Sequence, residues 1–446
     1  MTDATIAAPP GGPRRPVRIV HMGLGRFFRA HQAWYTDRAR DAESWGIAAF
    51  TVRSPRAAAE LAAQDCVYTL TVRGPEVDTE ERIDSVVAAH DGSDVDALCD
   101  YVSRPEVAVI TLTVTEAGYG LDAEGKPDMD DPEVSGDLHG LRTGTFGAHT
   151  VLGRLIAALD ARRRAGAGPI ALVPCDNVPG NGPFLARGLL RFAEQISGDL
   201  AAWIRENVSF VSTSVDRITP QTTGSEVVTE PFSDWVLAGD FPAGRPAWES
   251  AGARFVNDIE PWEARKLWLL NGAHSILAFA GLTRGLQTVS EAIAHPECRA
   301  LVDAFWDEAV QCLPAGTEVD DYREQLVVRF ANRRIEYRLS QIATDATTKA
   351  QFRFAAVSER SIEAGRSPEA SARATAAWIQ WVLGRPSEAD ARAAEIAAAA
   401  ASDDPMTALV EVISPRLAAS RAFMDRVRPA TAARPESLPR GAAVAS

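Results

Sequence analysis

Segment 266–274 places three polar side chains, Lys266, Asn271 and His274, in a strongly apolar stretch of the sequence. At about 100° per residue on an α-helix, all three can flank one pocket. A helix that is apolar around its circumference is buried, and burial lowers the pKa of a lysine because it disfavours the charged form. A lysine with a lowered pKa can act as a general base near neutral pH. The alternative is that Lys266 extends to solvent from a helix end and that Asn271 and His274 are hydrogen-bonded core residues. Periodicity alone does not choose between the two.

Polar residues also follow three predicted strands. They are Thr113, Thr115 and Glu116 at the end of 107–115, Asp176 and Asn177 after 169–174, and Asp216 and Arg217 after 208–215. Ligands bind beyond the carboxyl ends of the strands in parallel sheets, so these residues predict a shared cleft. Each residue taken alone also suits a cap or a turn.

A glycine pair follows the first predicted strand. Gly23 and Gly25 open a helical stretch, as in a dinucleotide-binding turn, where glycines let the backbone approach a pyrophosphate. The third glycine of the G-x-G-x-x-G pattern is replaced by Phe28, so the match is incomplete. A tight turn between strand and helix, with no ligand, is the alternative.

The segment after the second predicted strand lacks the acid that selects NAD in the plain dinucleotide pattern. Residues 51–56 contain Arg53 and Arg56 and no carboxylate. An arginine there can accommodate the 2′-phosphate of NADP, but solvated surface arginines are equally consistent with the pattern. The choice between NAD and NADP therefore stays open at this point.

The elements that must position these residues alternate in type along the first half of the chain. Apolar runs predict strands at 17–21, 45–52, 107–115, 169–174 and 208–215, and helical patterns lie at 143–165 and 183–196. This alternation predicts an α/β fold with a parallel, doubly wound sheet. Residues 121–140, dense in Asp, Gly, Pro and Glu, indicate a surface loop or insertion.

The pattern becomes mainly helical after about residue 240. Helices are predicted at 260–281, 296–312, 318–332, 350–364 and 367–383, and the Ala-rich residues 386–402 have high helix propensity. We therefore expect a disordered N-terminus at 1–16, an α/β domain at 17–245, a mainly α-helical C-terminal domain at 246–430 and a flexible tail at 431–446.

Composition narrows the classes of protein. The chain has 446 residues and a formal net charge of -14, which argues against binding nucleic acid or an anionic membrane surface. No apolar run is long enough to span a bilayer. Five dispersed cysteines fit reduced thiols in the cytoplasm and indicate no metal site. The expected partner is a small molecule, and the sequence predicts no particular protein partner.

Several motifs occur together between about residues 17 and 353. They are Gly23-Leu24-Gly25-Arg26-Phe27, Arg29-Ala30-His31-Gln32-Ala33, Gln64-Asp65, Tyr68-Thr69-Leu70, Thr113-Val114-Thr115-Glu116, Gly118-Tyr119, Cys175-Asp176-Asn177, Asn181-Gly182, Val215-Asp216-Arg217-Ile218, the 266–274 segment, and Gln341-Ile342-Ala343 with Asp345 and Lys349. In this order they resemble the polyol-specific long-chain dehydrogenases, the mannitol dehydrogenase family, which includes mannitol 2-dehydrogenase and fructuronate reductase. The resemblance implies a metal-independent, NAD(P)-dependent secondary alcohol dehydrogenase with a Rossmann-type domain and a helical domain. Its cofactor would be NAD, with NADP possible.

The resemblance also implies a role for each matching residue. Lys266 would be the general acid/base, Asn177 and Asn271 would hold the substrate oxygen, His274 would orient the lysine, and Asp216 and Glu263 would be its acidic neighbours. The cofactor would contact Gly23, Gly25, Phe27, Arg29, Arg53, Thr115 and Glu116, and the substrate would contact Asn177, Arg338, Gln341 and Lys349. One departure is Phe28, which stands where many members of the family have His.

The substrate is left between close competitors. Family enzymes for mannitol tend to have Arg at the position of Gln341, whereas those for fructuronate resemble this chain there. Mannonate/fructuronate and mannitol/fructose are therefore both expected pairs, each an open-chain polyol or sugar acid with its ketose. A phosphorylated mannitol, as in mannitol-1-phosphate 5-dehydrogenase, and a catalytically silent ligand sensor are the alternatives. The sensor is disfavoured because the residues of the matching catalytic set are all present.

Overall fold

The computed structural model describes residues 14–122, 125–145, 148–222, 224, 226–384 and 390–432. The chain folds into two units, of which the first comprises Met1–Arg73 with Val77–Ile259 and the second Gly74–Glu76 with Glu260–Ser446. The strand β12 (Arg254–Phe255) pairs with β11 (Asp234–Ala238), and Trp248 is fully buried in the first core. Residues 246–259, assigned to the helical domain from the sequence, therefore pack with the first unit.

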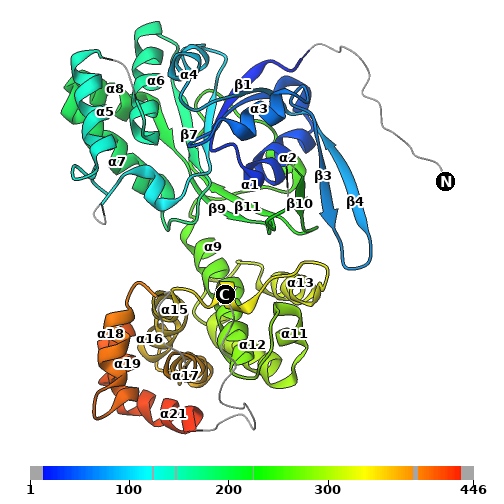
Figure 1. The fold of residues 1–446 in the computed structure, drawn as a ribbon, viewed down its shortest axis with the longest axis vertical. Coiled ribbons are helices and arrows are strands. Elements are labelled where there is room, and N and C mark those ends of the chain that lie inside the picture. The colour runs from blue at the N-terminus through cyan, green and yellow to red at the C-terminus, as the bar shows by residue number, and fades with distance from the viewer. Residues whose placement is uncertain are drawn as a thin grey trace, which may run out of the picture. The chain divides into compact units, whose positions relative to one another are not determined.

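The first unit is built on a six-stranded parallel sheet, as the alternation of elements predicts (Figure 1). Its strands are β1 (Val17–Met22), β2 (Gly46–Phe50), β5 (Val86–His90), β6 (Val109–Leu112), β7 (Ile170–Pro174) and β8 (Val208–Phe210). Their order is β5-β2-β1-β6-β7-β8. Strands β2 and β5 are added on one side of β1 and strands β6, β7 and β8 on the other, so the strand order reverses between β1 and β6. This is the strand order of the Rossmann fold, and ligands of that fold bind at the reversal point.

Helices cover both faces of this sheet because successive strand residues point to opposite sides. Ile19 packs into one core with α1 (Arg26–Ala30), α2 (Gln32–Arg38) and α3 (Arg56–Ala62). Its neighbour Val20 packs into the other core, which is formed with α4 (Val95–Val102), α6 (Val151–Ala165), α7 (Asn181–Ile196) and α8 (Gly198–Asn207). Strands buried on both faces read as continuous apolar runs, which is why the sequence predicts β1, β2, β6 and β7. It did not predict β5 at the edge of the sheet.

Two small sheets complete the first unit, and the sequence did not reveal them. One contains β3 (Tyr68–Arg73), β4 (Asp78–Ile83) and β10 (Val227–Thr229), and the other contains β9 (Ser212–Asp216), β11 and β12. The single strand predicted at 208–215 is wrong, because β8 belongs to the large sheet and β9 to a small one. The surface loop predicted at 121–140 is also wrong in part. It contains most of α5 (Pro132–Thr143), which Asp131 caps at its N-terminus.

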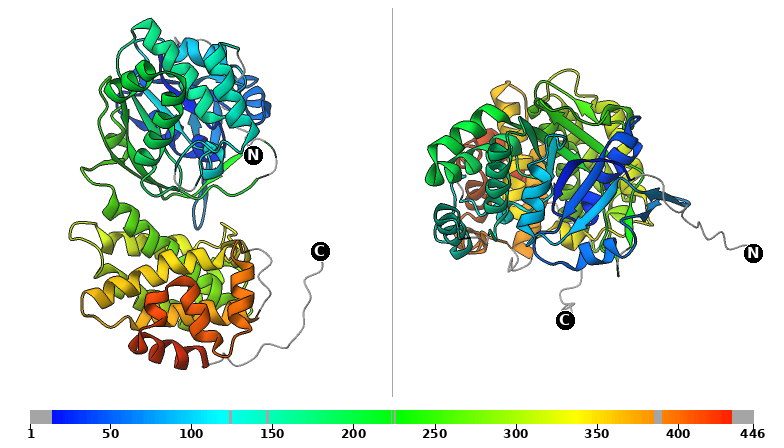
Figure 2. Two further views of the ribbon diagram at one scale, coloured as in Figure 1. Left: turned by 90° about the vertical axis from the view of Figure 1, so that its left-hand side faces the viewer. Right: turned by 90° about the horizontal axis from the view of Figure 1, so that it is seen from above.

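The second unit is mainly helical in its described part, as predicted, with one isolated β-bridge between Thr288 and Arg338, and Figure 2 shows its helices stacked against one another. They are α9 (Glu260–Arg265), a π-helix (Lys266–Gly272), α10 (Ala273–Leu282), α11 (Val289–Ala294), α12 (Pro296–Val310), α13 (Val319–Ala331), α14 (Leu339–Ile342), α15 (Ala346–Ala350), a second π-helix (Gln351–Ala355), α16 (Ala356–Glu363), α17 (Glu369–Gly384), α18 (Ala393–Ala400), α19 (Pro405–Ile413), α20 (Pro415–Ala418) and α21 (Arg421–Ala432). Helix α10 is buried along its whole length. The N-terminus predicted to be disordered at 1–16 and the tail predicted to be flexible at 431–446 lie mostly outside the described residues. Residues 14–16 are described, and residues 431–432 end α21.

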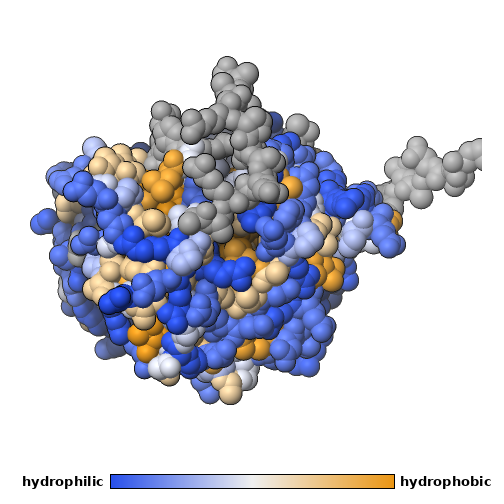
Figure 3. Space-filling model, turned by 90° about the horizontal axis from the view of Figure 1, so that it is seen from below, coloured by the Kyte–Doolittle hydropathy of each residue, from blue (hydrophilic) through white to orange (hydrophobic). Residues whose placement is uncertain are grey.

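The surface mixes residue types, and the cysteines are unpaired. In the view of Figure 3, hydrophobic residues lie in small groups separated by hydrophilic ones. None of the helices in the described ranges is long and apolar enough to cross a membrane. All five cysteines lie in these ranges and are free.

Candidate functional site

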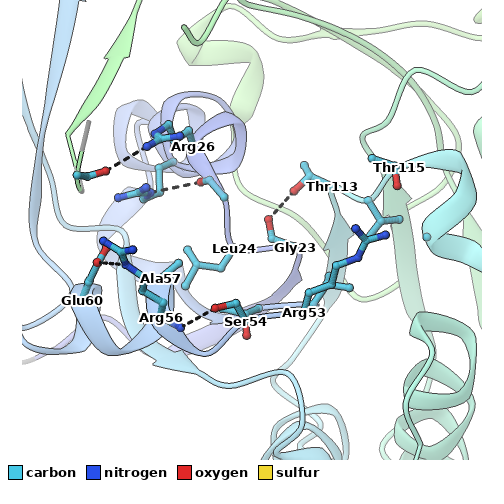
Figure 4. A pocket seen from close by; sticks show the side chains of 17 residues that line it. Gly23, Leu24, Arg26, Arg53, Ser54, Arg56, Ala57, Glu60, Thr113 and Thr115 are labelled. Carbon is cyan, nitrogen blue, oxygen red and sulfur yellow. Dashed lines mark hydrogen bonds and ion pairs between the residues drawn. The ribbon is translucent and has the colours of Figure 1, made fainter. Parts of the chain in front are cut away.

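A cavity of about 610 Å³ lies in the first unit at the carboxyl ends of β1, β2 and β6. Its wall includes the glycine turn after β1, residues 51–54 after β2 and residues 113–115 after β6 (Figure 4). The order of the strands reverses between β1 and β6, so the cavity lies where ligands bind in this fold.

Gly23 has a conformation and surroundings that only glycine satisfies. Its φ is +115°, and a Cβ built on it would lie 2.3 Å from the carbonyl oxygen of Thr113. The backbone N–H groups of Gly23 and Leu24 both donate to Phe50 O at 2.9 Å, and Thr113 Oγ1 donates to Gly23 O at 2.8 Å. The turn is thus held between β2 and β6, with its backbone exposed on the cavity wall. Gly25 has an extended conformation, and its Cβ would meet only ordinary contacts.

Phe28 occupies the place of the third glycine in the pattern because β1 offers it an aromatic partner. Its ring stacks on His21 with centroids 3.6 Å apart, and both side chains are fully buried. His21 Nδ1 lies 2.8 Å from Thr111 Oγ1, and its Nε2 lies 3.1 Å from Thr113 Oγ1. Burial lowers the pKa of His21 to about 3, so the ring is neutral and serves packing beneath the turn.

The cavity is lined by four arginines and one carboxylate. They are Arg26, Arg29, Arg53, Arg56 and Glu60. The carboxylate of Glu60 accepts a hydrogen bond from Arg56 Nε at 2.7 Å, which neutralises it. Arg53 is exposed and has no hydrogen bond or ion pair with any part of the chain that the structure describes. The wall is therefore positive, as an acidic chain that binds an anionic nucleotide requires.

The remaining predicted cofactor residues divide between the wall and the interior. Thr115 is exposed on the cavity wall. Phe27 is not among the residues that line the cavity and instead stacks on His31 at 4.9 Å. Glu116 begins a 3₁₀ turn (Glu116–Tyr119), and its side chain lies outside the described atoms.

The polar strand ends of the first unit have distinct environments. Asp176 accepts hydrogen bonds from the Tyr119 hydroxyl and from Val178 N, the latter at 3.1 Å, and so fixes the turn after β7. Asn177, the next residue, is exposed. Asp216 is buried at the end of β9 and pairs in register with Asp234 of β11. The carboxylate of Asp234 accepts a hydrogen bond from Arg254 Nη1 at 2.6 Å.

Arg217 has a structural role in the first unit. Its guanidinium donates to Ala30 O and Glu230 O and lies over the ring of Trp34 at 4.5 Å. Burial lowers the pKa of Arg217 to about 10. The residue joins α1 to the strands next to Asp216.

The polar residues of the second unit lie on a π-helix, where the sequence predicted a regular α-helix. Lys266–Gly272 is π-helical, with hydrogen bonds between residues i and i+5 in place of i and i+4. Lys266 and Asn271 are such an i, i+5 pair, so they lie one above the other, whereas an α-helix would turn them about 140° apart. His274 follows at the start of α10 and is buried between Phe330 and Tyr337, at ring distances of 4.8 and 5.3 Å. Lys266 is half-buried.

The other predicted residues of this unit are engaged in different ways. Glu263 is half-buried on α9, one turn before Lys266, and Gln341 is exposed on α14. Exposed Arg338 pairs with Glu336. Lys349 Nζ donates to the carbonyl oxygens of Ile342, at 3.0 Å, and Thr344, so it holds the end of α14. Burial, with a smaller effect of Arg353, lowers the pKa of Lys349.

Arg353 was missed by the sequence analysis. Its Nη1 donates to Asn271 O at 2.9 Å and to Ser275 Oγ at 2.7 Å. The two partners are 82 and 78 residues away in the sequence, so no local pattern indicates the contact.

The fold and the cavity define a Rossmann-type, dinucleotide-binding protein with a helical second domain. Comparison with known families agrees. The mannitol dehydrogenase Rossmann domain matches residues 17–250, and the mannitol dehydrogenase C-terminal domain matches residues 258–427. The chain belongs to the mannitol dehydrogenase family, and it is accordingly an oxidoreductase that acts on a polyol or sugar acid.

Individual relatives cover most of the chain. It is 33% identical to the D-mannonate oxidoreductase of Escherichia coli over 82% of this chain and 80% of that protein. It is 31% identical to a polyol:NADP oxidoreductase of Gluconobacter oxydans, over 82% and 80%. The structure of Pseudomonas fluorescens mannitol 2-dehydrogenase, a ternary complex with NAD and D-mannitol, matches with a TM-score of 0.76 at 31% identity, over 94% of this chain and 92% of that one.

Proposed function

We propose that the chain is an NAD(P)-dependent secondary alcohol dehydrogenase that interconverts an open-chain polyol or sugar acid with its ketose. The observation that supports the proposal is that Lys266 and Asn271 form an i, i+5 pair on one π turn, where they would act as the base and the amide donor. The relatives that act on D-mannonate and bind D-mannitol support this class of substrate.

The cavity of the first unit fits the dinucleotide. Its volume of about 610 Å³ lies in the range of cofactor pockets. The backbone at Gly23 and Gly25 would approach the pyrophosphate, while Arg26 and Arg29 would supply positive charge. Arg53 would stand near the 2′ position of the ribose, where NAD-selecting enzymes place an acid. When bound, the nicotinamide accepts or returns the hydride.

The catalytic roles are assigned to the residues that match the family. During oxidation the C–H bond of the carbinol breaks with its electron pair leaving as hydride, and Lys266 takes the O–H proton. During reduction Lys266 returns that proton to the new hydroxyl. The amide of Asn271 would donate to the oxygen, on which negative charge develops between the two states. Asn177 matches a residue with the same role in the family.

Three further residues would act around the lysine. His274 is fixed by the rings of Phe330 and Tyr337 and would orient Lys266. Glu263, one helical turn before Lys266 on α9, would favour its protonated form when a proton must be delivered. Asp216 matches a further acidic residue of the family's catalytic set.

The exact substrate depends on the side chains that bind the end of the polyol or sugar acid remote from the reacting carbon. Gln341 favours the mannonate/fructuronate pair, whereas mannitol/fructose remains the competing pair. Arg338 and Lys349 would contact a carboxylate after giving up Glu336 and the carbonyls at the end of α14, respectively. Acidic and neutral substrates must therefore be compared in the same assay.

A spectrophotometric screen tests the proposal. The wild-type protein is offered mannitol, arabinitol, sorbitol, mannonate, altronate and mannitol 1-phosphate, with NAD and NADP separately, and reduction of the dinucleotide is followed by absorbance. Turnover of a polyol or sugar acid is the expected result. No turnover with any of them would favour a ligand sensor.

The Lys266→Ala variant tests the mechanism. It should lower kcat by about 10²–10⁴-fold, the usual contribution of general base catalysis, and leave dinucleotide affinity unchanged. Lys126→Ala, which removes an exposed lysine of the first unit, is the matched control and should have wild-type activity. Full activity of Lys266→Ala between about pH 7 and pH 10 would exclude the lysine as the base.

A further inference from the structure

An arginine from a distant part of the chain holds the C-terminal end of the π-helix Lys266–Gly272. Arg353 Nη1 bridges Asn271 O, at 2.9 Å, and Ser275 Oγ, at 2.7 Å. Asn271 is near the end of the π turn, and Ser275 lies one α-helical turn beyond it. The guanidinium therefore spans the junction at which i+5 hydrogen bonding gives way to i+4 hydrogen bonding.

Arg353 projects from an element that is itself firmly packed. It lies in the second π-helix, Gln351–Ala355, whose neighbouring residue Phe354 is fully buried. The ring of Phe354 lies 5.7 Å from that of Phe305. Phe305 in turn packs so closely on Gly272 that a Cβ there would lie 2.7 Å from its ring. The two π-helices are thus joined twice, by the Arg353 hydrogen bonds and by the contacts through Phe305.

The register of the π-helix decides where the Asn271 amide points. An i, i+5 turn stacks Asn271 on Lys266, whereas a return to α-helical geometry would rotate the amide about 140° away from the lysine. π-Helices are rare and occur mostly as single turns at functional sites, so a contact that stabilises one at this position has a functional consequence. Burial lowers the pKa of Arg353 to about 10, which leaves the guanidinium charged at neutral pH.

We propose that Arg353 is a positioning residue for the reaction: it holds the Asn271 carbonyl and the Ser275 hydroxyl, and so keeps the π register that places the Asn271 amide above Lys266. This inference rests on the proposed function for its catalytic consequence. It does not require Arg353 to contact the substrate or the dinucleotide. Arginine suits the position because its planar fork donates in fixed directions, which a lysine ammonium does not reproduce.

Steady-state kinetics of Arg353 variants test the inference. Arg353→Met keeps a long apolar side chain and removes the donors, and we expect kcat to fall by about 10–100-fold, because a displacement of about 1 Å in a catalytic group can cost about 100-fold. The KM for the dinucleotide should change by less than about twofold, since the first unit carries that cavity. Arg353→Lys should recover part of kcat. Ser275→Ala, which keeps the contact with Asn271, should lose less than Arg353→Met.

Hydrogen–deuterium exchange gives a readout that is independent of activity. Exchange of the backbone amides at 266–275 should become at least about threefold faster in Arg353→Met, because the junction loses its clamp. Arg373→Met, which removes an exposed arginine from α17, is the control and should match the wild type in both measurements. The rates are expressed per folded molecule, so a loss of stability alone does not change kcat. A variant that is less stable but keeps the wild-type kcat would count against the inference.

The outcomes separate the two proposals. A wild-type kcat in Arg353→Met, or an effect on the dinucleotide KM alone, would overturn the positioning role. If the wild-type chain has no activity on any polyol or sugar acid, the proposed function fails. In that case unchanged exchange at 266–275 in Arg353→Met would overturn the structural role as well, and accelerated exchange would support it.

Discussion

Gly23→Ala is expected to destabilise the first unit, because the added methyl group has neither space nor an accessible backbone conformation. At φ +115° an L-residue is strained by about 1–3 kcal/mol. The Cβ would also lie 2.3 Å from Thr113 O, a contact that must open by about 1 Å to reach van der Waals distance. Opening it pulls on Gly23 N→Phe50 O and Thr113 N→Met22 O, both 2.9 Å, which are worth about 1 kcal/mol each. Because the two bonds are stretched and not lost, they add about 1 kcal/mol together, and the expected loss in the free energy of unfolding is about 2–4 kcal/mol.

Calorimetry of the full chain measures this loss. For a unit of this size, a loss of about 3 kcal/mol lowers the Tm at which the first unit unfolds by roughly 6–12 °C. Gly25→Ala is the matched control, since its Cβ would meet its nearest atom, Gly23 O, at 3.5 Å and its φ is negative. It should keep the wild-type Tm and lose dinucleotide affinity, because Gly25 lines the cavity. A Gly23→Ala protein within about 0.5 kcal/mol of the wild type would refute the reasoning.

Two further predictions concern charge in the first unit. Arg53→Ala should lower kcat/KM for NADP by about 10–100-fold, the value of one charge-assisted hydrogen bond of about 1.5–3 kcal/mol, and change kcat/KM for NAD by less than about threefold. Equal losses with both dinucleotides would show that Arg53 does not contact the 2′-phosphate. The pKa of His21 is lowered to about 3 in the folded chain, from an ordinary value of 6.5, so only the unfolded chain binds a proton between those values. The contribution of neutral His21 to the free energy of unfolding should be fully present above about pH 6.5. It should fall by about 1.4 kcal/mol per pH unit as the pH decreases toward about 3. Urea titrations of the wild type and His21→Gln should show a shallower decrease in the variant, and identical slopes would contradict a neutral His21.

Much of the large sheet was predictable because its signals are local. β1, β6 and β7 are short apolar runs, buried on both faces, and the glycines after β1 mark the turn that follows. Segment 208–215 shows where such signals stop. Val211 N still donates to Leu172 O of the large sheet, and the next residue begins a strand of another sheet. The residues of this segment suit a strand throughout, so the local sequence carries no information about that change of partner.

The dinucleotide cavity was partly predictable and partly not. Gly23 and Arg53 could be named because they follow predicted strands. That Phe28 can replace the third glycine could not be predicted, because it depends on the stacking of its ring on His21. The pairing of Glu60 with Arg56, which leaves the wall positive, depends on α3 facing the cavity.

The sequence by itself determined the class of fold and the helical nature of the second domain, because residue type and short-range periodicity encode them. For Lys266, Asn271 and His274 it determined only the residue types, and their catalytic roles stay a proposal. Only the tertiary structure decided that Lys266–Gly272 is π-helical. An apolar segment has no local preference for i+5 over i+4 hydrogen bonds. The register is set by groups far away in the chain, namely Phe305 packed on Gly272 and Arg353 bound to Asn271.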